Sequence, residues 1–301
     1  MKVRVGYGIG SALAPDPRRF GEMCTELERL GFDSLWLSER ATAEGPDPLI
    51  GLAYAAGCTR KLKLGMSVLV VPGRNPALLA KELASLDRLS DGRLLPGFGL
   101  GIADPREQQA FGVRREERAA WFDEAVPLIR RIWTEETVDH DGPRFSYRGL
   151  RVRPLPAQSP PDVWLGGDAP SELRRVGRLG DGWLPSFCTP ETAAKGRVVI
   201  EEAAEEAGRR IDPEHFGALV GYRYGELPER VVQALAVRRP ELDAADVLPR
   251  GLAALQQRLE EFVDAGFSKF VVLPIDEPPS WREELESVAA EVLPLQASPR
   301  G

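Results

Sequence analysis

Residues 62–99 read LKLGMSVLVVPGRNPALLAKELASLDRLSDGRLLPGFG and show the pattern that decides the fold, a strand, a helix and a second strand. Leu62 to Val71 is rich in Leu and Val, which is typical of a strand buried on both faces. Asn75-Pro76 predicts a helix start, because asparagine caps free N–H groups and proline needs no donor there. Ser90-Asp91-Gly92 ends the helix, and Arg93 to Gly99 forms the next strand.

The same strand-then-helix unit recurs along the whole chain. Further strands are predicted at 3–9, 34–38, 162–166, 182–185, 216–224 and 270–274, and helices are predicted to begin at Asp16-Pro17, Asp47-Pro48 and Thr189-Pro190. Eight such units favour a closed (β/α)8 TIM barrel, with an open doubly wound sheet as the alternative. We expect a single domain over residues 1–301, with an insertion between the fourth and fifth strands at approximately 134–162.

Composition excludes several classes of function. The net charge is −7 and no basic stripe is visible, which argues against a nucleic-acid partner. No apolar run reaches the ~18 residues of a membrane helix, and the first ten residues resemble a strand rather than a signal peptide. Cys24, Cys58 and Cys188 lack CxxC spacing, so we expect reduced thiols in the cytoplasm. With only two histidines, His140 and His215, we expect no metal site.

Function in such a barrel lies at the carboxyl ends of the strands, where three short segments stand out. Gly97 to Gly101 alternates glycine with larger residues; it is either a plain barrel corner or bare backbone that a flat ring can approach. Gly166 to Pro170 joins a strand to a helix; it is either a tight turn or a phosphate site made of free N–H groups. Glu39-Arg40 is either a surface pair or a charged pair at the barrel mouth.

Several short motifs, in this order and spacing, carry a family resemblance over nearly the whole chain, from Val3 to about Pro274. The most specific are Arg74-Asn75-Pro76, LDRLSDGRL at 86–94, RPLP at 153–156, WLGG at 164–167 and LGDGW at 179–183. The chain resembles the luciferase-like family of flavin- and deazaflavin-dependent oxidoreductases. That resemblance implies a TIM barrel that binds FMN or the deazaflavin coenzyme F420 at its carboxyl-terminal mouth.

The resemblance also implies roles for individual residues. It implies a cis peptide at Ser67-Val68 that bulges against the cofactor ring, with Gly99 and Gly101 lining the cofactor and its phosphate tail held at the turn of Gly166, Gly167, Asp168, Ala169 and Pro170. Many members have histidine where this chain has Arg40, and some have an acid where it has Ile102-Ala103. The acid–base pair of sugar-phosphate-oxidising members is therefore missing, which leaves Glu39 and Arg40 as the catalytic candidates.

The expected activity is hydride transfer between coenzyme F420 and a small organic substrate. Arginines outnumber lysines 33 to 6, a bias of GC-rich genomes such as those of F420-making actinobacteria, which favours the deazaflavin. The alternatives are an FMN-dependent monooxygenase fed by a separate reductase and a catalytically silent flavin-binding protein. Family members are commonly homodimers that pack through the second and third helices, which here cover residues 49–56 and 78–89.

Overall fold

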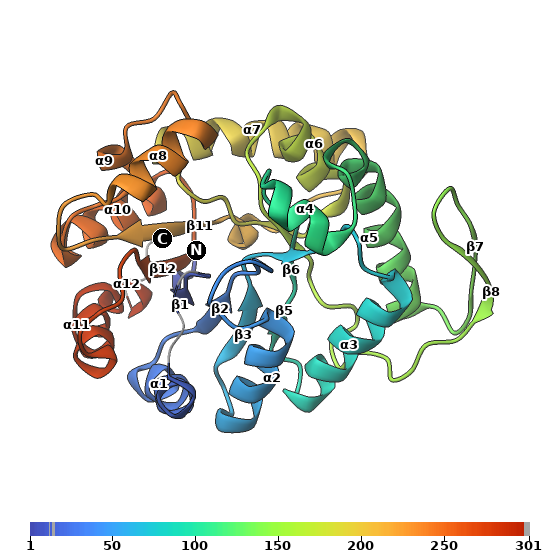
Figure 1. Ribbon diagram of the computed structural model, residues 1–301, viewed down its shortest axis with the longest axis horizontal. Coiled ribbons are helices and arrows are strands. Elements are labelled where there is room, and N and C mark those ends of the chain that lie inside the picture. Colours follow the sequence, from blue (N-terminus) through green and yellow to red (C-terminus); the bar gives the residue numbers. More distant parts are fainter. Residues whose placement is uncertain (12, 14–15, 298–301) are drawn as a thin grey trace.

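A computed structural model describes residues 1–11, 13 and 16–297 and shows a barrel of parallel strands surrounded by helices (Figure 1). Two of the eight barrel strands are interrupted: β3 continues as β4 beyond Ser67-Val68, and β5 continues as β6 beyond Pro96. The barrel strands are β1 (Arg4–Ile9), β2 (Ser34–Leu37), β3 (Lys63–Met66) with β4 (Leu69–Val70), β5 (Leu94–Leu95) with β6 (Gly97–Gly99), β9 (Trp164–Leu165), β10 (Gly182–Trp183), β11 (Gly217–Tyr222) and β12 (Lys269–Pro274).

Strand pairing runs round the complete ring. One sheet has the order β11-β12-β1-β2-β3-β5, and the other has the order β10-β9-β6-β4. On one side the two sheets are continuous through the interrupted strands, β3 with β4 and β5 with β6. On the other side, parallel bridges from Trp183 to Phe216 and from Ser186 to Leu219 join the β10 segment to the β11 segment. The predicted TIM barrel is confirmed, and the open sheet is wrong.

Helices begin where the sequence predicts, because capping side chains accept their first free N–H groups. Asp16, Asp47, Asn75 and Thr189 each cap a helix whose first residue is proline. The main outer helices are α1 (Pro17–Leu30), α2 (Pro48–Cys58), α3 (Pro76–Leu89), α5 (Arg118–Thr134), α6 (Pro170–Leu179), α7 (Pro190–Glu206), α10 (Leu252–Asp264) and α11 (Trp281–Val292). Shorter helices are α4 (Pro105–Phe111), α8 (Glu229–Arg238), α9 (Ala244–Val247) and α12 (Pro294–Ala297).

The segment between α5 and β9 departs from the barrel. It carries an antiparallel hairpin, β7 (Val138–Asp141) and β8 (Ser146–Leu150), which stands away from the barrel at the right of Figure 1. Helix α5 begins at Arg118, after α4 and a 3-10 turn. Gly112, with φ of 64°, ends α4 and separates the two helices.

Apolar side chains fill the barrel interior. Trp36 from β2 and Trp164 from β9 meet edge to face across it, with ring centroids 6.4 Å apart, and Leu184 and Val271 complete the layer. Glycines make room for the rings: a Cβ on Gly182 would lie 2.6 Å from the Trp164 ring. The interior is therefore a packed layer rather than a pore, and it separates the two ends of the barrel. Among the described residues, no helix is both long and apolar enough to cross a membrane.

Candidate functional site

The end of β2 places Glu39 in a buried clamp at the carboxyl-terminal mouth. One carboxylate oxygen accepts the N–H of Val70 at 2.6 Å, and the other binds the Arg74 guanidinium. Arg74 Nε in turn donates to the carbonyl of Val70 at 3.0 Å. The Glu39 side chain is only 6% exposed, and burial raises its pKa although Arg74 opposes the shift. Both oxygens of this predicted catalytic residue are thus already engaged.

The expected bulge lies between β3 and β4, where the Ser67-Val68 peptide is cis. Ser38 Oγ donates to the Ser67 carbonyl at 2.9 Å, and the N–H of Glu39 donates to the Val68 carbonyl at 3.1 Å. A Cβ on Gly99 would overlap Val68 Cγ2, and one on Gly166 would lie 3.3 Å from Val68 Cγ1. The structure therefore brings Ser67, Val68, Gly99 and Gly166 together, because glycine in β6 and glycine at the end of β9 leave space for the valine.

Two arginines, Arg118 beside Gly101 and Arg40 near Asp104, carry buried N–H groups without acceptors among the described residues. Arg118, 3% exposed, donates through Nη1 to the carbonyl of Ile102 at 2.7 Å, but its Nε and Nη2 have no partner among the described residues. Arg40 Nε is also buried without a partner in that part of the chain, and Arg40 Nη2 lies 3.9 Å from Asp104. Unpaired buried donors indicate a place for a ligand or water acceptor.

The sequence analysis missed Arg118 and a second residue of this rim, Glu107. The Glu107 carboxylate is buried and accepts the N–H groups of Ala41 and Thr42 at 3.1 and 2.9 Å, so it fixes the loop that follows Arg40. These contacts hold the Glu107 pKa below its usual value although burial opposes the shift. Glu107 and Arg118 lie in a run of charged residues that is typical of a solvated helix face, so no local signal identifies them.

The predicted phosphate turn is already occupied by a carboxylate of the chain itself. Gly167 has φ of +96°, and Pro170 begins α6. The N–H groups of Asp168 and Ala169, which we expected to be free, donate to Glu172 at 3.0 and 3.1 Å. Glutamate at the third helical position reaches back to the helix start in this way. The turn therefore binds an anion, but that anion is Glu172.

Asp168 adds a second negative charge to this turn and pairs with Arg239, which follows α8. A small cavity of about 40 Å³ lies beside the pair, lined in part by Trp183 and Thr192. The histidines lie elsewhere: His140 is on the hairpin and bonds Glu124 at 3.0 Å, and His215 lies at the amino-terminal end of the barrel. Among the described residues, no cluster of His, Cys, Asp or Glu could hold a metal ion.

The family model described as luciferase-like monooxygenase matches residues 2–267. The chain belongs to the luciferase-like monooxygenase family. A protein of Mycobacterium tuberculosis named as a coenzyme F420-dependent oxidoreductase is 27% identical over 71% of this chain. The chain described here spans 64% of the length of that relative, which is less than two thirds. An F420-dependent glucose-6-phosphate dehydrogenase of Kribbella flavida is 29% identical, over 90% of this chain and 92% of its own.

A solved structure shares the fold of this luciferase-like protein. It is an F420-dependent secondary alcohol dehydrogenase in complex with an F420-acetone adduct, and it superposes with a TM-score of 0.81 over 98% of this chain and 99% of its own. Sequence identity is 19%, so the likeness is one of architecture. It supports the (β/α)8 barrel.

Proposed function

We propose that this luciferase-like protein is an oxidoreductase that binds coenzyme F420 at its carboxyl-terminal mouth and transfers hydride between it and a small organic substrate. The packing of Val68 between Gly99 and Gly166 is the observation that carries the proposal. It presents a smooth apolar bulge flanked by bare backbone, which suits a flat ring. The relatives named as F420-dependent enzymes support this choice of cofactor.

The residues at the mouth fit such a cofactor. The deazaflavin ring supplies a carbon that gives or accepts hydride, and the protein binds and orients both reactants. The unpaired N–H groups of Arg40 and Arg118 suit the oxygen acceptors of the cofactor or of an anionic substrate. Arginine stays protonated near neutral pH, so Arg40 would bind and orient rather than deliver a proton. Glu39 would act as a positioning residue, because Val70 and Arg74 hold its carboxylate.

The turn from Gly166 through Gly167, Asp168 and Ala169 to Pro170 is proposed to take the phosphate of the cofactor tail. Glu172 shows that the N–H groups there converge on one anion. Phosphate could use those groups only after the Glu172 side chain rotates away. This exchange of one anion for another would make cofactor binding weaker than at an empty turn.

The runner-up function is FMN-dependent monooxygenation with a separate reductase, which the description of the family favours. Calorimetric titration of the purified protein with F420 and with FMN separates the two proposals. We expect saturable binding of F420 and no oxygen uptake during turnover. Tight binding of FMN alone, with oxygen uptake, would replace the first proposal with the second. Binding of F420 with no change in its visible absorbance, across a panel of alcohols and aldehydes, would favour a silent binder.

We also propose that the protein is a cytoplasmic homodimer. Ile50 and Tyr54 on α2 and Leu78 and Leu89 on α3 are large apolar side chains exposed to solvent, on two helices that pack against each other. Cys24 and Cys58 are free thiols, which suits a reducing compartment. Analytical ultracentrifugation tests the dimer: we expect Leu78→Lys to produce monomers, and a monomeric wild-type protein would contradict the proposal.

A further inference from the structure

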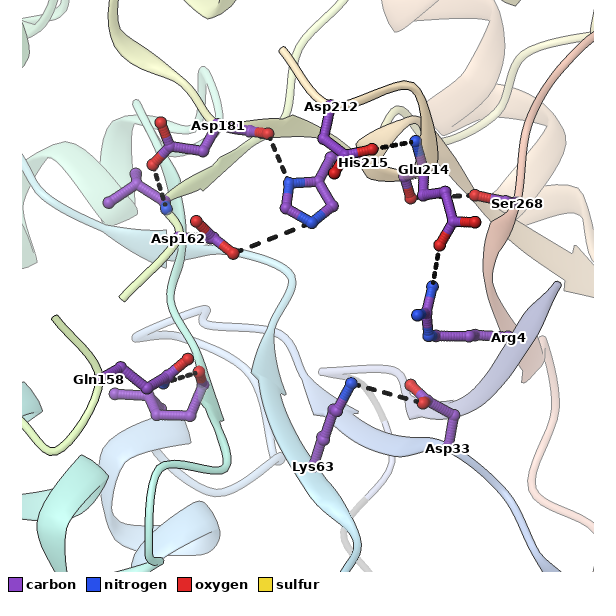
Figure 2. Close-up of polar contacts among 12 residues, drawn as sticks. Arg4, Asp33, Lys63, Gln158, Asp162, Asp181, Asp212, Glu214, His215 and Ser268 are labelled. Carbon is purple, nitrogen blue, oxygen red and sulfur yellow. Dashed lines mark hydrogen bonds and ion pairs between the residues drawn. The ribbon is translucent and has the colours of Figure 1, made fainter. Parts of the chain in front are cut away.

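A cavity of about 220 Å³ opens at the amino-terminal end of the barrel, opposite the proposed cofactor site. It is several times larger than the roughly 30 Å³ that one water takes up in the liquid. Residues at the starts of several strands surround it, including Arg4, Lys63, Asp162 and His215, whose side chains border the open space in Figure 2. Ordinary barrels use this end for stability rather than for binding, so its contents need an explanation.

One wall of the cavity carries excess positive charge. Lys63 and Lys269 share a single carboxylate, that of Asp33, and the Lys63 ammonium is 3.7 Å from it. Arg93 also lines the cavity and donates only to backbone carbonyls and to the hydroxyl of Thr59. Among the described residues, Asp33 is the one carboxylate within ion-pair distance of any of these three cations.

The facing wall carries excess negative charge. Asp162 has His215 as its nearest cationic partner, at 3.8 Å, and the other ring nitrogen of His215 bonds the carbonyl of Asp181 at 3.0 Å (Figure 2). Asp212 also lines the cavity, and its carboxylate accepts the N–H of Glu214. Glu214 itself is balanced by Arg4 at 3.0 Å. Neither Asp162 nor Asp212 has a lysine or arginine within ion-pair distance in the described part of the chain.

Trp164 lines the cavity and belongs to the apolar layer inside the barrel. It is 3% exposed, and its indole N–H has no acceptor among the described residues. A buried donor without a partner is uncommon in native proteins and indicates an acceptor that the cavity has to supply. The Trp36–Trp164 layer separates this acceptor position from the carboxyl-terminal mouth.

We propose that this cavity binds a small zwitterion, a molecule with one carboxylate and one ammonium group such as a free amino acid. The carboxylate would lie toward Lys63 and the indole N–H of Trp164, and the ammonium toward Asp162. A simple anion would face Asp162 and Asp212 without compensation, and a simple cation would face Lys63 and Lys269. Only a ligand with both charges complements both walls.

Calorimetry on the full chain, with and without F420, tests the proposal. The ligands are glycine, L-alanine and L-glutamate, with acetate and methylammonium as single-charge controls. We expect one or more of the amino acids to bind saturably, at least about tenfold more tightly than either control, and with the same affinity when F420 is present. Failure of all three amino acids to bind, or acetate binding equally well, would overturn the proposal, and neither result bears on the cofactor site.

Matched variants locate the binding. Lys63→Gln and Asp162→Asn remove one charge from each wall at half-exposed positions, so the variants should fold, which circular dichroism checks. Each should weaken amino-acid binding by about tenfold, the loss of one charged contact. Lys61→Gln and Glu202→Gln make the same changes at exposed positions outside the cavity and should leave affinity unchanged. Binding that survives both cavity variants would place the ligand elsewhere and refute the assignment.

Discussion

Glu39 and Arg74 bind both backbone polar groups of Val70, its N–H and its carbonyl. The carboxylate accepts the Val70 N–H, the guanidinium donates to the Val70 carbonyl, and the two side chains form an ion pair with each other. Val70 follows the cis step by two residues, so this clamp fixes the strand segment on which the bulge depends. Glu39, a candidate acid in the sequence, therefore holds the backbone of Val70 in place.

Replacing Glu39 by alanine should destabilise the fold by about 2–3 kcal/mol, because the Arg74 charge and the Val70 N–H both lose their buried acceptor. Urea denaturation measures this loss. Asp47→Asn is the matched control, because asparagine keeps the oxygen that caps α2. It removes a half-exposed charge 3.7 Å from the same guanidinium and should change stability by about 1 kcal/mol or less. Equal losses of stability in the two variants would show that the contacts of Glu39 stabilise the fold no more than an exposed ion pair does.

Gly99→Ala tests the packing of the bulge. The new methyl group would overlap Val68 Cγ2, and valine has little rotamer freedom with which to yield. We expect F420 affinity to fall by about tenfold or more, equivalent to roughly 1.4 kcal/mol. Gly57→Ala is the control, because a Cβ there meets nothing within 4 Å in helix α2, and it should leave affinity intact. F420 affinity that is unchanged in Gly99→Ala would remove Gly99 from the site.

Glu172→Ala frees the N–H groups of Asp168 and Ala169. If the cofactor phosphate uses this turn, F420 binding should strengthen severalfold, even though loss of the helix-capping carboxylate costs about 1 kcal/mol of stability. Fluorescence titration measures the affinity. Glu191→Ala, which removes an acid from the first turn of α7, should not change it. Weaker or unaltered binding in Glu172→Ala would mean that the tail lies elsewhere.

Arg40→Gln tests whether the Arg40 guanidinium, whose buried Nε has no acceptor among the described residues, contacts a ligand. The variant keeps hydrogen-bonding capacity and loses the charge, so we expect about tenfold weaker binding of F420 or a tenfold higher KM for an anionic substrate. Arg106→Gln removes another arginine that pairs with the same Asp104 but is largely exposed, and it should behave as wild type. If Arg40→Gln and Arg106→Gln have the same F420 affinity and the same KM, Arg40 is not part of the site.

Lys269 makes stability depend on pH. Burial lowers its pKa to about 8 although Asp33 opposes the shift, whereas an unfolded lysine titrates near 10.4. Between these values the unfolded chain binds more protons than the folded chain, so stability should rise as pH increases from about 8 to about 10.4. Chemical denaturation of wild type and Lys269→Met isolates this contribution, which the variant should lack. Parallel pH profiles would contradict it.

Much of the fold follows from local chemistry and could be read in the sequence. Pairs such as Asp47-Pro48 and Asn75-Pro76 predict helix starts through capping alone, and apolar runs such as 270–274 predict buried strands. The cis peptide at Ser67-Val68 followed from family resemblance. Contacts between distant segments could not be predicted in this way, because nothing near Glu39 in the sequence indicates Arg74, and nothing near Asp168 indicates Arg239.

The occupancy of the turn at 166–170 by Glu172 had a local signal. Glutamate at position 172, three residues after Ala169, matches the spacing of a helix-capping acid, and this spacing predicts the occupied turn that the structure shows. The amino-terminal cavity had no such signal. Its walls come from the starts of β1, β3, β9 and β12, so its opposed charges become visible only when the barrel closes.

The paired indoles of Trp36 and Trp164 divide the cylinder into two compartments, each with its own access to solvent. The redox chemistry proposed for the carboxyl-terminal end would thereby be separated from a charged ligand at the amino-terminal end. The charged side chains around Lys63 and Asp162 could therefore be redesigned to bind a chosen metabolite without altering the proposed cofactor site.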